Sequence, residues 1–169
     1  EVPSGCWLTG PFNLTSHMTL FLSDATILAS DNFDDWPVVP PLPSYGRGRE
    51  LPGKRYAGFI SAHHAQDLII VGSNGTIDGQ GQRWWDAHHA GSLNFTRGRL
   101  IEPMDSERII LTNLTLKNSP FWTVHPYNSN NISITHLNIQ NPPHSPNTDG
   151  IDPDSCQFVY ISDCTIDVG

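Results

Sequence analysis

The chain has 169 residues, a formal net charge of -8 and only 15% charged residues, with 14 Gly and 14 Pro. The negative charge argues against binding to nucleic acid or to an anionic membrane surface. No stretch approaches the roughly 20 apolar residues of a membrane span. Low charge together with many Gly and Pro is typical of a loop-rich β protein, and the length suits one domain over residues 1–169.

A short apolar pattern recurs along the chain. Its clearest copy consists of Ile109, Leu111, Leu114 and Leu116. The pattern returns from Ile132 and again from Val159. It also fits residues 20–27 and, with one extra residue, residues 68–77. Each copy predicts two short strands joined by a bend that resets which side chains face inward.

Copies of this size cannot bury an apolar face alone, so they must stack. An antiparallel sandwich is the alternative, but the copies are far apart and lack the Asn-Gly or Asp-Gly turns of hairpins. The pattern therefore favours an all-β fold, a right-handed parallel β-helix. Residues that tolerate turn conformations stand at or near the expected bends, namely Asp24, Asn74, Asn113, His136 and Asp163.

Two passages interrupt the repeat. Residues 31–59 are rich in Pro and Gly and predict a long insertion between coils, which either serves function or covers one face of the solenoid. Within residues 82–94 lies the only passage that could form a short helix.

Neither the histidines nor the acids have the spacing of metal ligands. The pairs His63–His64 and His88–His89 lack the spacing and cysteine partners of a zinc site. The acids Asp149, Asp152 and Asp154 lack the spacing of a calcium loop. No metal site or other cofactor is expected, and the histidines are interpreted as loop or strand-edge residues.

Five Asn-x-Ser/Thr sequons indicate a secreted glycoprotein of the extracellular space or cell wall. Their asparagines are Asn13, Asn74, Asn94, Asn113 and Asn131. The three cysteines are an odd number, so at least one of Cys6, Cys156 and Cys164 is unpaired or has a partner outside this chain.

The stretch 145–154 displays three carboxylates between two prolines in a chain where charge is sparse. Hydrolysis of a sugar acetal needs one carboxylic acid and one carboxylate. Asp149, beside Asn147, Thr148 and Gly150, is the best candidate for such a group. The alternative is that the three acids only cap turns. If Asp149 points outward and Ile151 inward, a bend is required near Gly150.

Residues 147–152, Asn-Thr-Asp-Gly-Ile-Asp, resemble the first sequence block of glycoside hydrolase family 28, the polygalacturonases and their relatives. Residues 118–126, Asn-Ser-Pro-Phe-Trp-Thr-Val-His-Pro, are similar to the segment before that block in the plant-like and bacterial branch. Residues 75–81 with Trp84 and Trp85 are similar to the early coils of the family. The resemblance spans nearly the whole chain in the expected order and implies a right-handed parallel β-helix.

The resemblance also implies an activity, the inverting hydrolysis of α-1,4-linked galacturonan in pectin. Asp149 would help to activate the attacking water, and Asn147 and His125 would contact the substrate. For His125, an equally good alternative is a histidine held by a neighbouring coil. Further cations that could bind polygalacturonate are Arg47, Arg49, Lys54, Arg55, Arg97 and Arg99. We expect the complete protein to be monomeric.

The sequence departs from the family where a Gly-Asp-Asp block should follow. That block, a later histidine and an Arg-Ile-Lys block do not occur among the 169 residues. Asp152 and Asp154 do not match the Asp-Asp pair. We therefore expect a longer parent protein to be the enzyme and these residues alone to be inactive. The alternatives are a non-catalytic carbohydrate-binding or degenerate β-helix, and a calcium-dependent lyase of the same fold.

Overall fold

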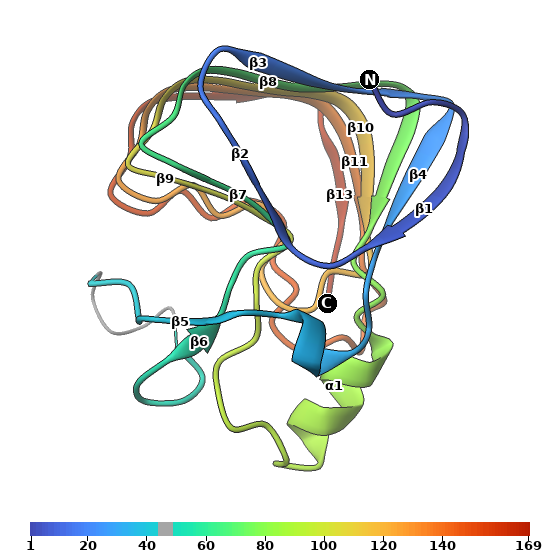
Figure 1. Cartoon of the computed structure of the whole chain (residues 1–169), viewed down its shortest axis with the longest axis vertical. Coiled ribbons are helices and arrows are strands. Elements are labelled where there is room, and N and C mark those ends of the chain that lie inside the picture. Colours follow the sequence, from blue (N-terminus) through green and yellow to red (C-terminus); the bar gives the residue numbers. More distant parts are fainter. Residues whose placement is uncertain (44–48) are drawn as a thin grey trace.

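Coils of parallel strand wind around a shared apolar interior in the computed structural model, which describes residues 1–43 and 49–169 (Figure 1). The largest sheet has the order β1-β4-β8-β10-β11-β12, with β3 paired to β8 and β13 to β11. Its strands are β1 (Gly5–Thr9), β3 (Met18–Ser23), β4 (Ala25–Ala29), β8 (Gln66–Asp78), β10 (Glu107–Lys117), β11 (Asn130–Gln140), β12 (Gln157–Ser162) and β13 (Thr165–Asp167). All these pairs are parallel. The predicted parallel β-helix is confirmed.

The strand register follows the apolar repeat. Ile109 pairs with Ile132, and Ile132 in turn pairs with Val159. The prediction of one extra residue in β8 is wrong. Val71 pairs with Thr112 and Gly75 pairs with Leu114, so three residues of β8 lie opposite one residue of β10 and the bend has two extra residues. A Cβ on Gly72 would lie 2.7 Å from Leu114 Cδ2 and one on Gly75 would lie 3.0 Å from it. Two glycines thus fit the longer bend beneath one leucine side chain.

The bends of successive coils lie above one another in left-handed backbone conformation. The five predicted bend residues all have positive φ, at 48° for Asp24, 54° for Asn74, 55° for Asn113, 53° for His136 and 54° for Asp163. A second column, which the apolar pattern does not predict, consists of His17, Asp67, Arg108, Asn131 and Phe158. Bulky Arg108 and Phe158 rarely adopt this conformation. Their pairing with neighbouring coils overrides the local preference.

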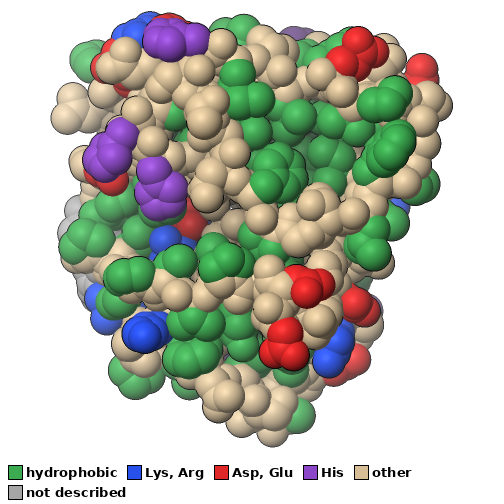
Figure 2. Space-filling model, viewed as in Figure 1, with side chains coloured by type: hydrophobic (Ala, Val, Ile, Leu, Met, Phe, Trp, Pro, Cys, Tyr) green, Lys and Arg blue, Asp and Glu red, His purple; other side chains and the backbone are tan. Residues whose placement is uncertain are grey.

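The core is a set of stacked aliphatic columns inside the coils. Leu22, Ile77, Leu116 and Ile139 are completely buried. Full burial of one such side chain contributes about 1.5–3 kcal/mol. The outermost coils leave apolar side chains uncovered, including Trp7 and Leu8 in β1 and Ile161 in β12. Figure 2 shows hydrophobic side chains gathered over the first coil, which faces the viewer.

A second parallel sheet forms another side of each coil. It contains β2 (Phe12–Leu14), β7 (Ile60–His63) and β9 (Ile101–Met104). Single bridges extend it from Ile101 to Val124 and from Val124 to Ile151. The residues of this register that point away from the core form the first outward row, which is Asn13, Ser61, Glu102, His125 and Asp152. The second outward row is His63, Met104, Tyr127 and Asp154. We call this surface the outer face.

Most of the described residues between β4 and β7, where the sequence predicts an insertion at residues 31–59, lie outside the coils, although Phe59 is buried in the core. The insertion contains the 3-10 helix η1 (Phe33–Asp35) and the antiparallel pair of β5 (Val38–Val39) and β6 (Arg55–Tyr56). Figure 1 shows these elements and α1 (Gln82–His89) below the second sheet. The helix predicted within residues 82–94 is confirmed. No helix of the described residues is long and apolar enough to cross a membrane.

Aromatic side chains attach the insertion to α1. The Trp84 ring centroid lies 4.3 Å from that of Phe33, 5.0 Å from that of Trp36 and 4.9 Å from that of Tyr56. Trp84 is completely buried. Aromatic pairs at these distances stabilise packing beyond the burial of their area, so they hold η1 and β6 against α1.

Candidate active site

Asp149 is an exposed residue directly before the bend at Gly150. Its carbonyl oxygen accepts a hydrogen bond of 2.8 Å from Thr123 N, and Gly150 O accepts one of 3.1 Å from Val124 N. Gly150 is buried, and a Cβ there would lie 2.7 Å from Ile166 Cγ2. The bend leaves Asp149 outside while Ile151 packs against the core. The bend expected near Gly150 is confirmed.

The side chain of Asn141 forms hydrogen bonds that hold the backbone before Asp149. Its Oδ1 accepts a hydrogen bond of 2.8 Å from Ser119 N, and its Nδ2 donates to Thr123 Oγ1 and Thr148 O, each at 2.9 Å. Asn141 is buried, so these bonds are shielded from water. The side chain joins three segments and fixes the peptide between Thr148 and Asp149.

Arg97 fixes the turn that leads to Asp149. Its Nη1 donates to Pro120 O at 2.7 Å and Pro146 O at 2.9 Å, while its Nη2 donates to Asn147 Oδ1 at 3.0 Å. Its Nε donates to Glu50 Oε1 at 2.6 Å. Arg97 is completely buried, and burial lowers its pKa. Arg97 is therefore a structural clamp rather than an exposed cation for substrate.

Asp152 occupies the first outward row beside His125. Burial, followed by the negative charge of Asp149, raises the pKa of Asp152 to about 7, and Arg99 opposes this shift. Its Oδ2 is buried and has no hydrogen-bond partner among the described residues. Sequence reasoning assigned Asp152 no role in the site. The bend at Gly150 lies between Asp152 and Asp149, whose charge acts on it.

Glu102 is the centre of a buried ionic cluster. Arg55 Nη1 donates to Glu102 Oε2 at 2.6 Å, and Arg99 Nε lies 3.6 Å from Oε1. His125 Nδ1 lies 3.4 Å from the same Oε1, and His125 Nε2 lies 3.8 Å from Asp154 Oδ2. Burial alone would raise the pKa of Glu102, but the hydrogen bond from His125 and the charges of Arg99 and Arg55 bring it down to about 2.

This cluster contains three of the residues that the sequence offers as candidates for substrate binding. His125 is buried and its Nδ1 faces Glu102 of the neighbouring coil, while its contact with substrate stays a prediction. Arg55 and Arg99 are buried as well, and burial lowers the pKa of Arg99 to about 10. Among the described members of the expected basic cluster, Lys54 is exposed whereas Arg55 is buried and paired with Glu102. Arg47 lies outside the described residues.

The sequence also predicts glycosylation sites and at least one unpaired cysteine. The five sequon asparagines, Asn13, Asn74, Asn94, Asn113 and Asn131, are all exposed. Cys6, Cys156 and Cys164 are free thiols, and burial raises the pKa of Cys156. Among the described residues, no group of three His, Cys, Asp or Glu is placed to hold a metal ion.

Comparison with known proteins decides the family. The glycosyl hydrolases family 28 profile matches residues 6–169. The chain belongs to this family. A "Probable polygalacturonase" from Vitis vinifera is 56% identical over 166 residues, which are 98% of this chain and 34% of that protein. An "Endo-polygalacturonase" from Pectobacterium carotovorum subsp. carotovorum is 30% identical over 98% of this chain and 43% of its own length.

Solved structures of two polygalacturonases share the fold. The polygalacturonase from Erwinia carotovora superposes with a TM-score of 0.81 at 30% identity, over 97% of this chain and 46% of that chain. An exopolygalacturonase from Thermotoga maritima gives a TM-score of 0.82 at 25% identity, over 99% of this chain and 44% of that one. The chain thus spans between a third and a half of the length of these relatives.

Proposed function

We propose that this chain is the part of a pectin hydrolase that carries one water-activating carboxylate, Asp149. The reaction would be inverting cleavage of α-1,4-galacturonosyl linkages in polygalacturonate. The observation that supports it best is the exposed Asp149 on a backbone fixed by Asn141 and Arg97. A base that must orient a water needs such a fixed position. The relatives named polygalacturonases support the substrate class.

An inverting mechanism needs a second carboxyl group about 6.5–9.5 Å from the first, so that a water fits between base and sugar. Asp149 would take the proton of that water, and the second group would protonate the leaving oxygen. Asp152 does not match the Asp-Asp pair that the resemblance implies for this second role. We propose that the general acid lies outside these 169 residues and that they are inactive alone.

The cellular setting is part of the proposal. Exposure of all five sequon asparagines is compatible with N-glycosylation in the secretory pathway. Pectin is a cell-wall polymer, so the enzyme would act as a secreted, extracellular or wall-bound monomer.

The test is an assay of the complete protein beside a chain of residues 1–169. We expect the complete protein to release new reducing ends from polygalacturonate, with nuclear magnetic resonance showing inverted anomeric configuration in the first product. Residues 1–169 should release none. Unsaturated products that absorb ultraviolet light would instead identify a lyase. Binding of polygalacturonate without any cleavage by the complete protein would identify a non-catalytic carbohydrate-binding protein.

A further inference from the structure

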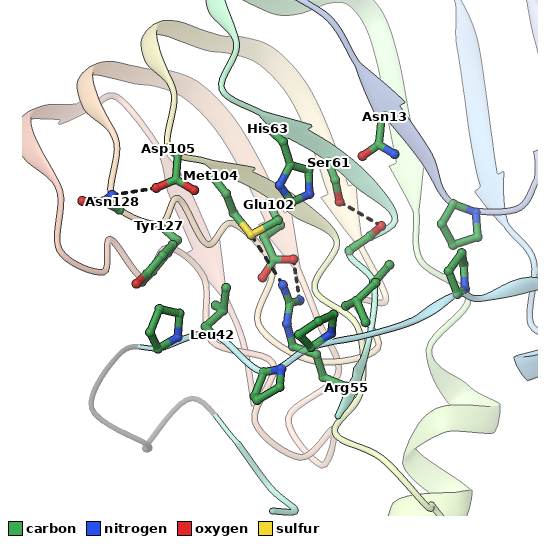
Figure 3. Close-up of a pocket in the computed structure, with 18 of the residues that line it drawn as sticks. Asn13, Leu42, Arg55, Ser61, His63, Glu102, Met104, Asp105, Tyr127 and Asn128 are labelled. Atoms are coloured by element: carbon green, nitrogen blue, oxygen red, sulfur yellow. Dashed lines mark hydrogen bonds and ion pairs between the residues drawn. The ribbon is translucent and has the colours of Figure 1, made fainter. Parts of the chain in front are cut away.

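The insertion covers a cavity on the outer face. The cavity has a volume of about 500 Å³ and lies between residues 37–43 and the second sheet. We call residues 37–43 the strap. Figure 3 shows Leu42 of the strap on one side, with Asn13, Ser61, His63 and Tyr127 on the other. The proposed function does not use this cavity.

The charges in the cavity are unfavourable for an anion. Among the described residues, the only Lys or Arg that lines it is Arg55, which is 3% exposed and bound to Glu102. Asp105 adds an exposed carboxylate, whose Oδ1 accepts a hydrogen bond of 2.6 Å from Asn128 Nδ2. Arg49 donates to the carbonyl oxygen of Leu42 at 3.1 Å and does not line the cavity. Of the described residues, an anion entering here would meet the carboxylate of Asp105 and no Lys or Arg other than Arg55, which is paired with Glu102.

The rest of the lining suits an uncharged polar ligand. The strap contributes the rings of Pro40, Pro41 and Pro43 and the side chain of Leu42. The floor of the cavity is the part of the outer face opposite the strap. It contributes neutral hydrogen-bonding groups on Asn13, Ser61 and Asn128, together with the ring of Tyr127. Sugar rings have apolar C–H faces and hydroxyl edges, so apolar walls with a few neutral polar groups fit them.

The cavity lies on the same surface as Asp149. Ser61 and Glu102 of its floor continue along the first outward row to Asp152, three residues after Asp149. Parallel strands are about 4.8 Å apart, so β9 lies about 10 Å from the strand of Asp152. We consider a polysaccharide that lies across the sheet with its scissile linkage at Asp149. A sugar residue of that polysaccharide near the linkage would then lie in this cavity.

We propose that the cavity under the strap is a subsite for an uncharged sugar unit of pectin, and not for a free galacturonate. Two sources supply such a unit: a methyl-esterified galacturonate and a neutral sugar within the backbone. This inference rests on the proposed function, because it assumes that pectin crosses the outer face. It also requires Asn13 to be unmodified, since a glycan there would occupy the cavity.

The test is a calorimetric titration of the complete protein with Asp149→Asn, which prevents turnover. The ligands are hexagalacturonate, its methyl ester, and a rhamnogalacturonan hexamer that alternates charged and neutral units. Asn13→Ala removes neutral hydrogen bonds from the floor and should weaken binding of the preferred uncharged ligand about fivefold. The same change should leave the affinity for hexagalacturonate nearly unchanged. Whichever ligand loses affinity, methyl ester or rhamnogalacturonan, identifies the source of the unit.

Two charge variants test the exclusion of anions. Asp105→Asn keeps a residue that tolerates the positive φ of 49° and should strengthen hexagalacturonate binding about threefold. Leu42→Lys adds a cation to the strap and should strengthen it further. The control is Asp163→Asn, an exposed residue on another coil with the same change of charge.

The results separate this proposal from the proposed function. If no cavity variant changes affinity more than the control does, or if all three ligands change equally, the subsite is refuted. Cleavage of polygalacturonate by the complete wild-type protein would still support the proposed function in that case. If none of the three oligomers binds and no pectin is cleaved, both proposals are wrong.

Discussion

Arg97 Nη2 and Asn147 Oδ1 are joined by a hydrogen bond of 3.0 Å, two residues before Asp149. The same guanidinium binds Glu50 of the insertion through Nε at 2.6 Å. One buried side chain therefore connects the insertion with the turn that presents the proposed catalytic carboxylate. Hydrogen bonds of one side chain thus link the insertion with the candidate site, although Glu50 and Asn147 lie far apart in the sequence.

Replacement of Arg97 tests this link. Arg97→Lys keeps the charge but cannot bond Glu50, Pro120 and Asn147 together, because lysine lacks the planar fork. We expect a loss of about 2–3 kcal/mol in the free energy of unfolding of residues 1–169, measured in urea. Arg83→Lys is the control, because Arg83 is exposed and its Nη1 donates to Asp31 O at 3.1 Å at the surface. Equal effects of the two substitutions would refute the clamp.

Removal of the Asp149 carboxylate tests the proposed chemistry. Asp149→Asn in the complete protein should lower kcat about 10²- to 10⁴-fold and leave KM nearly unchanged, since the base acts only in the transition state. The melting temperature should stay within about 2 °C, because the side chain is exposed. Asp163→Asn changes charge equally at an exposed site and should keep full activity. Activity near wild type for Asp149→Asn would exclude it as the base.

The buried cluster predicts acid sensitivity. Glu102→Gln leaves Arg55 and Arg99 without their anion and should cost about 3–5 kcal/mol of unfolding free energy at pH 7. In the wild type, the folded pKa of Glu102 is about 2, below its unfolded value of about 4.3. Its stabilising contribution is therefore complete above about pH 4 and is lost as the pH falls towards 2.

The control for this cluster is Glu107→Gln, which changes a less buried glutamate that pairs with Arg108. Surface pairs contribute about 0–1 kcal/mol, so a small effect is expected. Urea titrations at several pH values measure both variants. A Glu102→Gln chain as stable as the Glu107→Gln chain would show that the cluster contributes nothing.

Asp152 predicts the opposite slope with pH. Its folded pKa of about 7 exceeds its unfolded value of about 3.9, so the folded state holds the proton more tightly between these values. Stability should therefore fall as the pH rises from about 4 to about 7. Asp152→Asn should remove this slope and stabilise the chain by about 2 kcal/mol at pH 8, after allowance for partial exposure. A pH profile identical to that of the wild type would refute the raised pKa.

Much of the fold could be predicted from the sequence, because stacked coils repeat one local pattern. The spacing of Ile109, Ile132 and Val159 predicted their pairing, and the bend at Asn113 followed from its residue type. The length of the bend in β8 could not be predicted, since spacing alone does not show how Gly72 and Gly75 share one space. The bend at Phe158 is equally hidden, because its neighbours impose a conformation that its own side chain disfavours.

The site was predicted less completely. Asp149 stands out in the sequence because it lies in an acid-rich stretch between two prolines, where residues 147–152 resemble the first sequence block of the family. Glu102 does not, because a single glutamate gives no sign that Arg55, Arg99 and His125 will surround it. Arg55 and His125 are separated from Glu102 by 47 and 23 positions, respectively, and only the coil register brings them together.

The insertion also has a consequence for the order of folding. Met18 of β3 pairs with Leu68 of β8 across the whole insertion, whereas Ile109 of β10 pairs with Ile132 of β11 in the very next coil. The first loop is roughly twice as long as the second, and a doubling of loop length costs about 0.6 kcal/mol of chain entropy. The later coils are therefore expected to form first, and the N-terminal coil to dock onto a template that already exists.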